Sequence, residues 1–376
     1  MHSTPQLGLL AAGVMAFSTC AMAQNVTLYG RVDVGVQNIH NGTSRTGVDS
    51  GTYTASRLGF RGTEDLGGGL SALFFMEMGI NADKGEAAGG SRLFNRGSYV
   101  GLSSTSAGTL TLGRQYVPIF WPFLFADDAG PLRLHGYSAV QSVQRTNFFR
   151  ANSSALNTPV ANGGLATAGS GIYSVGITSA FENNLIVYKT PSMGGLTVSA
   201  AYGAPEGYAD SAKVMGANAE YRQGDLYLGA GWNRKQGQVT GGTATQKINE
   251  SMVGGMYSVT KEFNVWGNLH GWELETGAVA GDKFKGHDAM VGVSYKLPTG
   301  QLWANYAAKS VNNCTDCGSR GFGVGYHHLL SKRTDVYVSY GRVNNDRNSA
   351  NSLNSFAPTT AGTGVRGFGA GIAHQF

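Results

Sequence analysis

The sequence has little charge, few prolines and few cysteines, and it lacks a long apolar run beyond its first residues. Charged residues make up 14% of the 376 positions, well below the roughly 25% of soluble domains. No apolar stretch of about 18 residues follows the N-terminus, which excludes a membrane-spanning helix there. The 3 cysteines argue against a disulfide-dependent fold, and the net charge of +5 comes without a Lys/Arg cluster, which argues against nucleic-acid binding.

The N-terminus carries the features of a secretory signal peptide. Leu7–Phe17 form an apolar core, and Ala21-Met22-Ala23 supplies a small-x-small cleavage site. The leader contains no Lys or Arg, so a different translation start is an open alternative, and Cys20 leaves a lipoprotein anchor as another. We therefore predict a signal peptide over residues 1–23 and one mature unit over residues 24–376.

What the chain does have is glycine, with 57 residues, and strict alternation between apolar and polar residues. In Val26–Val36 the valines and Leu28 share one face, whereas Arg31 and Asp33 share the other. A period of two indicates a strand with one apolar and one polar side. A soluble sandwich would bury the apolar side, whereas a membrane barrel turns it outward to lipid.

The spacing of the turns favours the barrel. Seven short polar or Gly-rich turns alternate with eight longer breaks, and together they would join sixteen strands with both termini on the short-turn side. An even number of strands with short turns at one rim and long loops at the other is typical of outer-membrane barrels. We predict an all-β fold, a 16-stranded antiparallel transmembrane β-barrel. The short turns are Glu64–Gly69, Ser103–Gly108, Pro191–Gly195, Arg222–Asp225, Val259–Glu262, Leu297–Gly300 and Leu330–Arg333. The longer breaks lie near 40–52, 80–95, 204–213, 234–249, 272–286, 309–320 and 343–365, together with one large insertion.

The insertion, at about residues 116–182, interrupts the alternation for far longer than a usual connection. It opens with the aromatic stretch Tyr116–Phe125, continues with Asp127-Asp128, and then contains Arg133, Arg145 and Arg150. We predict that this segment is the long third loop, that it folds into the barrel lumen, and that it narrows the channel.

Long, ordered motifs across the mature chain resemble the general porins of Gram-negative outer membranes, in particular the neisserial and β-proteobacterial branch. They are Leu28–Arg31, Ser56–Leu70, Asn95–Arg96, Tyr99–Leu102, Thr111–Gln115, Tyr188–Pro191, Gly195–Leu196, Leu330–Asp335 and the terminal Phe376. The resemblance implies an outer-membrane homotrimer through which small hydrophilic solutes and ions diffuse without a cofactor. It also implies contacts with outer-membrane lipid and lipopolysaccharide, and a barrel-assembly machinery that reads Phe376 as part of its signal.

In that family, basic residues on the barrel wall face acidic residues on the third loop. The matching wall positions are Arg31, Arg57, Arg61 and Arg96, and the strand alternation places the first three on the polar face. The orientation of Arg114, at the mouth of the insertion, is open, and Glu77 shares the polar side of its strand. Each arginine could instead be a rim residue that pairs with phosphates or nearby acids.

Asp127 and Asp128 are the candidates for the acidic side, with a solvated loop pair as the alternative. Facing rows of opposite charge in a narrow passage would focus a transverse field. Because arginines outnumber acids in this set, we predict a mild preference for anions.

The sequence departs from the family pattern at Phe181–Asn184, where an arginine usually precedes the two asparagines and Glu182 stands instead. Arg145 or Arg150 could replace the missing charge. The aromatic stretch is also more apolar than such a loop requires. Either it packs the loop against the wall, or it lines the constriction itself.

Cys314-Thr315-Asp316-Cys317 has the spacing of a redox motif, but it falls in an expected loop without a helix, so a small loop disulfide is the favoured interpretation. We expect no metal site. An enzyme remains the competing class because some outer-membrane barrels are hydrolases, but the chain has no Gly-x-Ser-x-Gly. An adhesin or structural barrel is the third class, and it would typically be smaller or carry an extra domain.

Overall fold

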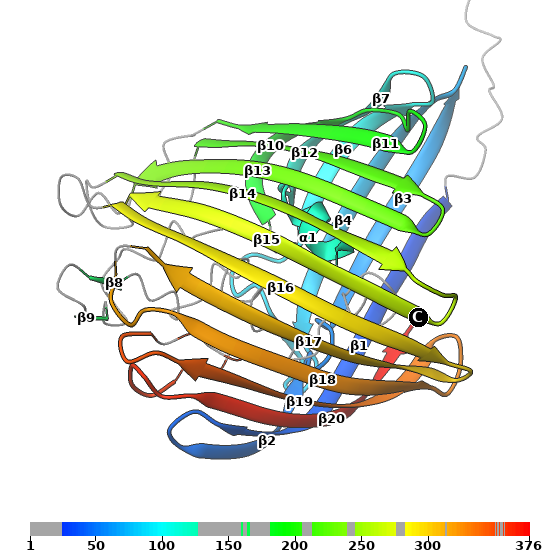
Figure 1. Ribbon diagram of the computed structural model, residues 1–376. Coiled ribbons are helices and arrows are strands. Elements are labelled where there is room, and N and C mark those ends of the chain that lie inside the picture. The colour runs from blue at the N-terminus through cyan, green and yellow to red at the C-terminus, as the bar shows by residue number, and fades with distance from the viewer. Residues whose placement is uncertain are drawn as a thin grey trace, which may run out of the picture.

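The fold is a closed antiparallel β-barrel (Figure 1). The computed structural model describes residues 25–126, 159–160, 164–165, 181–204, 213–238, 245–275, 283–312, 314–349, 351, 353, 356 and 358–376. The predicted signal peptide and most of the insertion, including Asp127, Asp128, Arg133, Arg145 and Arg150, lie outside these residues. Among the described residues, no helix is long and apolar enough to cross a membrane.

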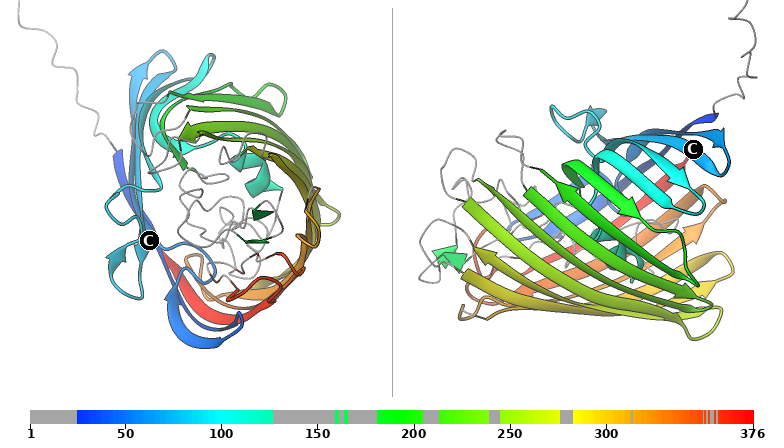
Figure 2. Two further views of the ribbon diagram at one scale, coloured as in Figure 1. Left: turned by 90° about the vertical axis from the view of Figure 1, so that its left-hand side faces the viewer. Right: turned by 90° about the horizontal axis from the view of Figure 1, so that it is seen from above.

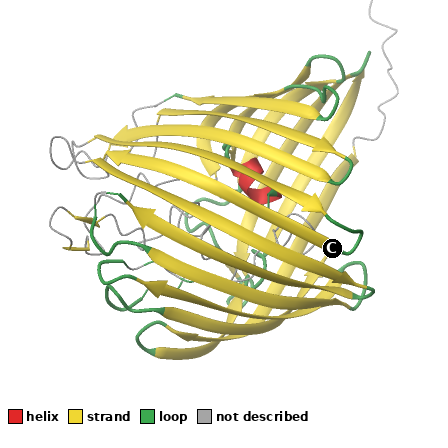
Figure 3. Cartoon of the chain, in the orientation of Figure 1, coloured by secondary structure: helices red, strands yellow, loops and turns green. Residues whose placement is uncertain are grey.

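Eighteen strands form one sheet, of which sixteen make the wall, and β2 (Ser44–Ser50) and β5 (Glu86–Ala87) are short additions to it. Figure 3 shows this wall of strands around the short helix α1 (Phe120–Phe125). A separate pair, β8 (Pro159–Val160) and β9 (Gly164–Leu165), belongs to the insertion. The wall strands are β1 (Asn25–His40), β3 (Arg57–Gly67), β4 (Leu70–Asn81), β6 (Gly97–Ser104), β7 (Gly108–Tyr116), β10 (Phe181–Lys189), β11 (Leu196–Gly203), β12 (Lys213–Gln223), β13 (Leu226–Gln238), β14 (Thr245–Ser258), β15 (Phe263–Glu275), β16 (Lys283–Leu297), β17 (Gly300–Val311), β18 (Ser319–Leu329), β19 (Thr334–Asn345) and β20 (Val365–Gln375).

The two faces of the wall have opposite character. Outward-pointing residues such as Val100, Leu269 and Val291 are 58%, 60% and 61% exposed, whereas inward-pointing residues are largely polar and buried. A soluble protein buries its apolar side chains, so this reversal indicates that the outer face lies against lipid. The predicted sixteen-stranded membrane barrel is confirmed.

The barrel closes where β1 meets β20, with Arg31 opposite Gln375 and His40 opposite Arg366. At the end of this seam the backbones of Gly30 and Phe376 exchange two hydrogen bonds of 3.0 and 3.1 Å. The Phe376 ring lies so close to Gly30 that a Cβ on residue 30 would overlap it. Closure pairs each of the sixteen described wall strands on both sides, which matters in the hydrocarbon because unsatisfied backbone groups cost several kcal/mol each there.

All seven short turns lie between the strands for which they were predicted, at one rim of the barrel. At the other rim the strands run further than expected. The breaks predicted near 234–249 and 272–286 are shorter, because β13 to β16 continue through charged residues that pair across strands, such as Lys285 with Glu273 at 2.7 Å. The break predicted near 40–52 is mostly a β1–β2 hairpin.

We predict that Gly30→Val weakens the closing seam. The added Cβ would lie 2.8 Å from the carbonyl oxygen of Arg57 and would overlap the Phe376 ring. Overpacking of this kind costs about 1–3 kcal/mol, so the urea midpoint of the refolded barrel should fall. Gly271→Val is the control, since its nearest neighbour is the Ser251 hydroxyl at 4.0 Å. Equal midpoints for the two variants would contradict this account of the seam.

Candidate functional site

An arginine cluster lines the lumen side of β1, β3 and the segment before β6. Arg31 and Arg57 are direct cross-strand partners on β1 and β3. Like charges directly opposite one another are unfavourable, so nearby carboxylates are needed. Asp335 on β19 accepts a hydrogen bond from Arg31 at 2.9 Å, and Glu77 on β4 lies 3.7 Å from the Nε of Arg57.

Glu77 is the centre of this cluster. Its carboxylate accepts hydrogen bonds from Nε of Arg96 at 2.7 Å and from the Tyr29 hydroxyl at 3.0 Å, in addition to the contact with Arg57. Arg96 also donates to the Tyr116 hydroxyl, at the start of the insertion, at 3.2 Å. Charge-assisted bonds of this kind fix the orientation of the arginines along the wall.

The other two predicted arginines occupy different settings. The Arg61 guanidinium lies over the Tyr29 ring, 5.2 Å from its centroid, and Arg61 is exposed. Arg114 follows Gly113, whose φ of +134° lies in the region that favours glycine. Its guanidinium donates to the carbonyl of Asn95 at 2.8 Å and to Asn183 Oδ1 at 2.7 Å.

The segment between β2 and β3 folds over the inner face, which the sequence did not reveal. The Asp33 carboxylate accepts hydrogen bonds from the backbone N–H groups of Tyr53 and Thr54 and, at 2.6 Å, from the Tyr337 hydroxyl. The Tyr53 hydroxyl in turn lies 3.0 Å from Nδ1 of His327. The alternation placed Asp33 on the polar face, but only the register shows these partners.

The aromatic stretch lies inside the barrel against the wall formed by β12, β13 and β14 (Figure 2). Glycines on the inner face of these strands make the close approach possible. A Cβ at Gly231 would come within 3.0 Å of the Ile119 backbone, and one at Gly254 would come within 2.8 Å of Ala126 Cβ. At these glycines no side chain projects from the wall, so the backbone of the segment can lie directly against it.

Apolar packing holds this docked segment. The exposed fractions of Phe120, Phe123 and Leu124 are 4%, 3% and 2%. They share a buried cluster whose other members are Val117, Ile119, Leu185, Val214, Ile248, Met252, Trp272 and Leu274. Of the two alternatives for the aromatic stretch, the structure shows wall packing for residues 117–126. Asp127 and Asp128, the predicted acidic side, follow outside the described residues.

Glu182, which departs from the family pattern, is neutralised by a residue that the sequence analysis missed. Lys235 on β13 donates to its carboxylate at 2.8 Å, and the two side chains are 8% and 9% exposed. The alternation along β13 could have placed Lys235 inward, but its pairing with a residue 53 positions away depends on the barrel closing. The acid at position 182 therefore adds no net charge here.

A second buried group lies beneath α1, where His270 stands between two carboxylates. Its Nδ1 is 3.0 Å from Asp288, and its Nε2 is 3.4 Å from Glu250. Phe123 packs edge-on against the imidazole, with ring centroids 5.1 Å apart. The docked segment thus shields two more inward-facing acids from the lumen.

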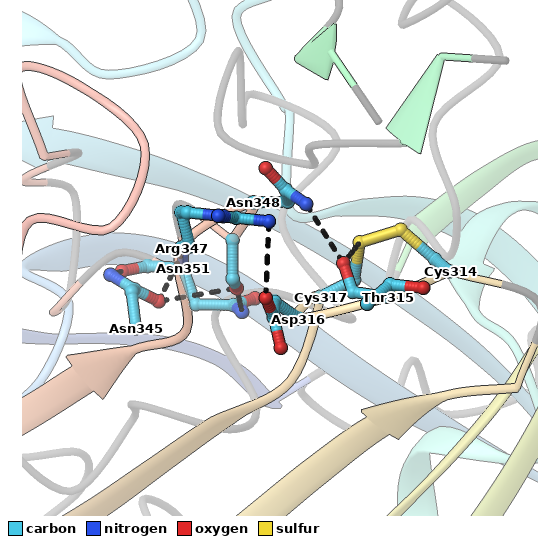
Figure 4. Close-up of a disulfide and its surroundings, with 9 residues drawn as sticks. Cys314, Thr315, Asp316, Cys317, Asn345, Arg347, Asn348 and Asn351 are labelled. Carbon is cyan, nitrogen blue, oxygen red and sulfur yellow. Dashed lines mark hydrogen bonds and ion pairs between the residues drawn. A yellow bond between two sulfur atoms is a disulfide. The ribbon is translucent and has the colours of Figure 1, made fainter. Parts of the chain in front are cut away.

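Cys314 and Cys317 are bonded in a disulfide within the loop between β17 and β18 (Figure 4). Asn348, in the loop after β19, donates to the Thr315 carbonyl at 2.8 Å, and its backbone N–H donates to the Asp316 carbonyl at 2.8 Å. These contacts join two neighbouring loops at the rim. Within the described part of the chain, no cluster of three or more His, Cys, Asp or Glu residues could hold a metal ion.

Comparisons with known proteins all find porins of Gram-negative bacteria. A family model described as Gram-negative porin matches residues 9–348. The outer membrane porin protein 32 of Delftia acidovorans is 32% identical over 98% of this chain and 99% of its own length. An outer membrane porin protein of Bordetella pertussis is 27% identical over 95% and 98% of the two chains.

Solved structures give the same relationship. An anion-selective porin from Comamonas acidovorans superposes with a TM-score of 0.74 at 27% identity, covering 94% of this chain and all of that one. A trimer form of the outer membrane protein OmpT of Vibrio cholerae has a TM-score of 0.65 at 18% identity, covering 94% and 100%. At that identity the likeness shows the fold alone.

We predict that Lys235→Met destabilises the barrel, because it leaves the buried Glu182 carboxylate without its cation. Breaking one side of a buried pair costs about 3–5 kcal/mol. Adding Glu182→Gln should recover most of the loss, since the double variant no longer buries a charge. The urea midpoints of the single and double variants measure this coupling, and additive losses would show that the pair is not a unit.

Proposed function

The chain belongs to the Gram-negative porin family, and from this we propose that its lumen is a water-filled channel for passive diffusion of small hydrophilic solutes and ions, with a mild preference for anions. It is an outer-membrane protein, as its relatives are. We assign it no catalytic activity. The anion-selective porin at 27% identity supports the proposed preference.

The proposed selectivity rests on which charged side chains in the lumen are exposed to water. Seven inward-facing carboxylates are each at most 7% exposed, and the exposed inward-facing charges include two arginines near the short-turn mouth, Arg61 and Arg222. The buried acids are Asp33, Glu77, Glu182, Glu220, Glu250, Asp288 and Asp335. A permeating ion would therefore meet these two arginines in water, and these seven carboxylates only through their partners.

Because the carboxylates are buried, the exposed arginines set the sign of the electric field that a permeating ion meets. Charges along a narrow aqueous passage with low-dielectric walls focus the field in the passage. Arg222 is held in place because its guanidinium lies over Phe125 and Tyr227, 4.0 and 4.3 Å from the ring centroids. The docked segment, through Phe125, thus helps to hold a positive charge at the short-turn mouth, in addition to its proposed role in narrowing the channel. The facing role of Asp127 and Asp128 remains part of the proposal.

We also propose a homotrimer, as in the trimer form of the OmpT structure. The outer faces of the first and last strands are the proposed subunit contacts. Exposed aliphatic residues there include Val32 and Val36 on β1 and Ile372 on β20. The terminal Phe376 is 44% exposed, so its ring is accessible to the proposed barrel-assembly machinery. The remaining outer face would contact outer-membrane lipid and lipopolysaccharide.

The experiment that tests the channel is a bilayer recording. The purified barrel should insert in steps of three equal conductances, and a salt gradient should give a reversal potential of the sign set by anion movement. Folded protein without conductance would contradict the channel, and a reversal potential of the opposite sign would contradict the selectivity.

We predict that Arg61→Gln lowers the anion-to-cation permeability ratio roughly twofold. The interaction of two unit charges about 8 Å apart in water is about 0.5 kcal/mol, which corresponds to that factor. Arg333→Gln, which removes the same charge from an exposed short turn, is the matched control and should leave the ratio unchanged. Equal ratios for the two variants would remove Arg61 from the selectivity mechanism.

A further inference from the structure

Four half-buried aromatic rings follow one another inside the barrel, and we call Tyr116, Trp121, Phe125 and Phe181 the aromatic row. The ring centroid of Tyr116 lies 4.1 Å from that of Phe181 and 5.1 Å from that of Trp121. Trp121 stacks on Phe125, with centroids 5.9 Å apart. Each ring therefore contacts the next, from the start of β10 and the end of β7 to the end of α1.

The aromatic row uses the side of the docked segment that does not pack against the wall. Four of the six residues of α1 are buried, whereas Trp121 and Phe125 are only half-buried. Residues four apart lie on the same face of a helix, so these two rings share the side of α1 that is not buried. Because α1 lies inside the barrel (Figure 2), that side borders the lumen.

Guanidinium groups lie at both ends of the aromatic row. At one end Arg96 and Arg114 lie over the Phe181 ring, with Cζ 5.3 and 5.8 Å from its centroid. At the other end Cζ of Arg222 lies 4.0 Å from the Phe125 centroid. Arginine presents a planar fork that matches the two oxygens of a carboxylate, so each end of the row can hold an organic anion.

The carboxylates near the two ends are less exposed than the arginines. The side chain of Glu77, which pairs with Arg96, is 8% exposed, against 16% for Arg96. The side chain of Glu220, which lies 3.9 Å from Arg222, is 5% exposed, against 43% for Arg222. A solute beside the row therefore meets these guanidinium groups more readily than these carboxylates.

This combination of rings and cations matches one class of solute. Aromatic rings attract one another in offset or edge-on arrangements with centroids roughly 4.5–7 Å apart, through their quadrupoles as well as through burial. A saturated ring of the same size gains from burial alone. A planar aromatic ring that carries a carboxylate can use the rings of the row and a guanidinium at its end at the same time.

We propose that the aromatic row binds aromatic carboxylates, of which benzoate is the simplest, on their way through the channel. The ring of the solute stacks against Trp121 and its neighbours in the row, and its carboxylate binds the guanidinium groups at an end of the row. This inference rests on the proposed channel function, and it names the class of anion that the lumen favours.

The test titrates benzoate into the chloride current of single channels in planar bilayers at neutral pH, where benzoate is ionised. Cyclohexanecarboxylate is the matched ligand, because it has the same charge and a similar size but a saturated ring. Benzoate should block the current saturably, with a half-blocking concentration at least about threefold lower than that of cyclohexanecarboxylate. Equal half-blocking concentrations for the two ligands on the unchanged protein would overturn the proposal, and this comparison needs no variant.

Substitutions of two tryptophans locate the site. Trp121→Leu keeps an apolar side chain without the ring and should remove the advantage of benzoate, whereas Trp121→Phe should retain most of it. Trp232→Leu is the matched control, because Trp232 shares the alternation of the exposed Leu228 on β13 and so lies on the outer face. An advantage that survives Trp121→Leu, or one that Trp232→Leu removes as well, would contradict the site.

A neutral ring tests the part played by charge. Asp127 and Asp128 follow Phe125 in the sequence, outside the described residues, so the sign of the charge beside the row needs its own measurement. Benzyl alcohol should have a half-blocking concentration at least about threefold higher than that of benzoate. Block by benzyl alcohol at the same concentration would overturn the assignment of the row to carboxylates.

Binding to the folded barrel in detergent separates a failure of this inference from a failure of the channel. Heat-modifiable mobility on gels reports whether each protein is folded, and saturation-transfer NMR compares benzoate with cyclohexanecarboxylate without any current. A benzoate preference without conductance would support the site and contradict the channel. Conductance without a benzoate preference in either measurement would contradict the site and leave the channel in place.

Discussion

The two faces of the barrel wall depend on the closure of one sheet. Within the hydrocarbon no water is available to satisfy backbone groups, so the chain must pair each strand on both sides. The seam between β1 and β20 meets this requirement, and the hydrogen bonds between Gly30 and Phe376 complete it at the chain terminus. Once the sheet is closed, strand alternation alone decides that one set of side chains meets lipid and the other meets the lumen.

The lumen then has an electrostatic constraint of its own. Closure places Arg31 beside Arg57 and gathers other charges from strands far apart in sequence. Carboxylates on the wall hold the arginines in fixed positions: Glu77 binds Arg96, and Asp335 binds Arg31. The Tyr29 hydroxyl donates to Glu77 as well. Among the described residues, the buried inward-facing acids are paired in this way or covered by the docked segment, whereas Arg61 and Arg222 stay exposed near the short-turn mouth. Selectivity in this account follows from which charges remain in contact with water.

The sequence predicted the strand number, the seven short turns and the inward side of Arg31 and Arg57, because these depend on local alternation and turn chemistry. It underestimated the length of β13 to β16, because residues such as Glu273 and Lys285 are typical of loops until a neighbouring strand supplies the opposite charge. Lys235 was missed for a similar reason, since its partner Glu182 is reached only through the closed barrel.

The docking of the aromatic stretch was also undecided from the sequence. Aromatic residues suit a buried contact and a permeation path equally well. The deciding features are glycines such as Gly231 and Gly254, and a glycine in a strand does not reveal that another backbone approaches it. Only the register of β12 to β14 shows that these glycines form one smooth area under residues 118–126.

The central claim is that the start of the insertion is fixed on the inner wall and restricts the lumen from that position. Ile119→Cys combined with Gly231→Cys tests it directly, because a Cβ at residue 231 would lie 3.2 Å from the Cβ of Ile119. The account predicts that the two thiols form a disulfide in the folded barrel, and that single-channel conductance is the same before and after its reduction. A pair that stays reduced, or a conductance that changes when the bond is cut, would show that the segment occupies another position in the working channel.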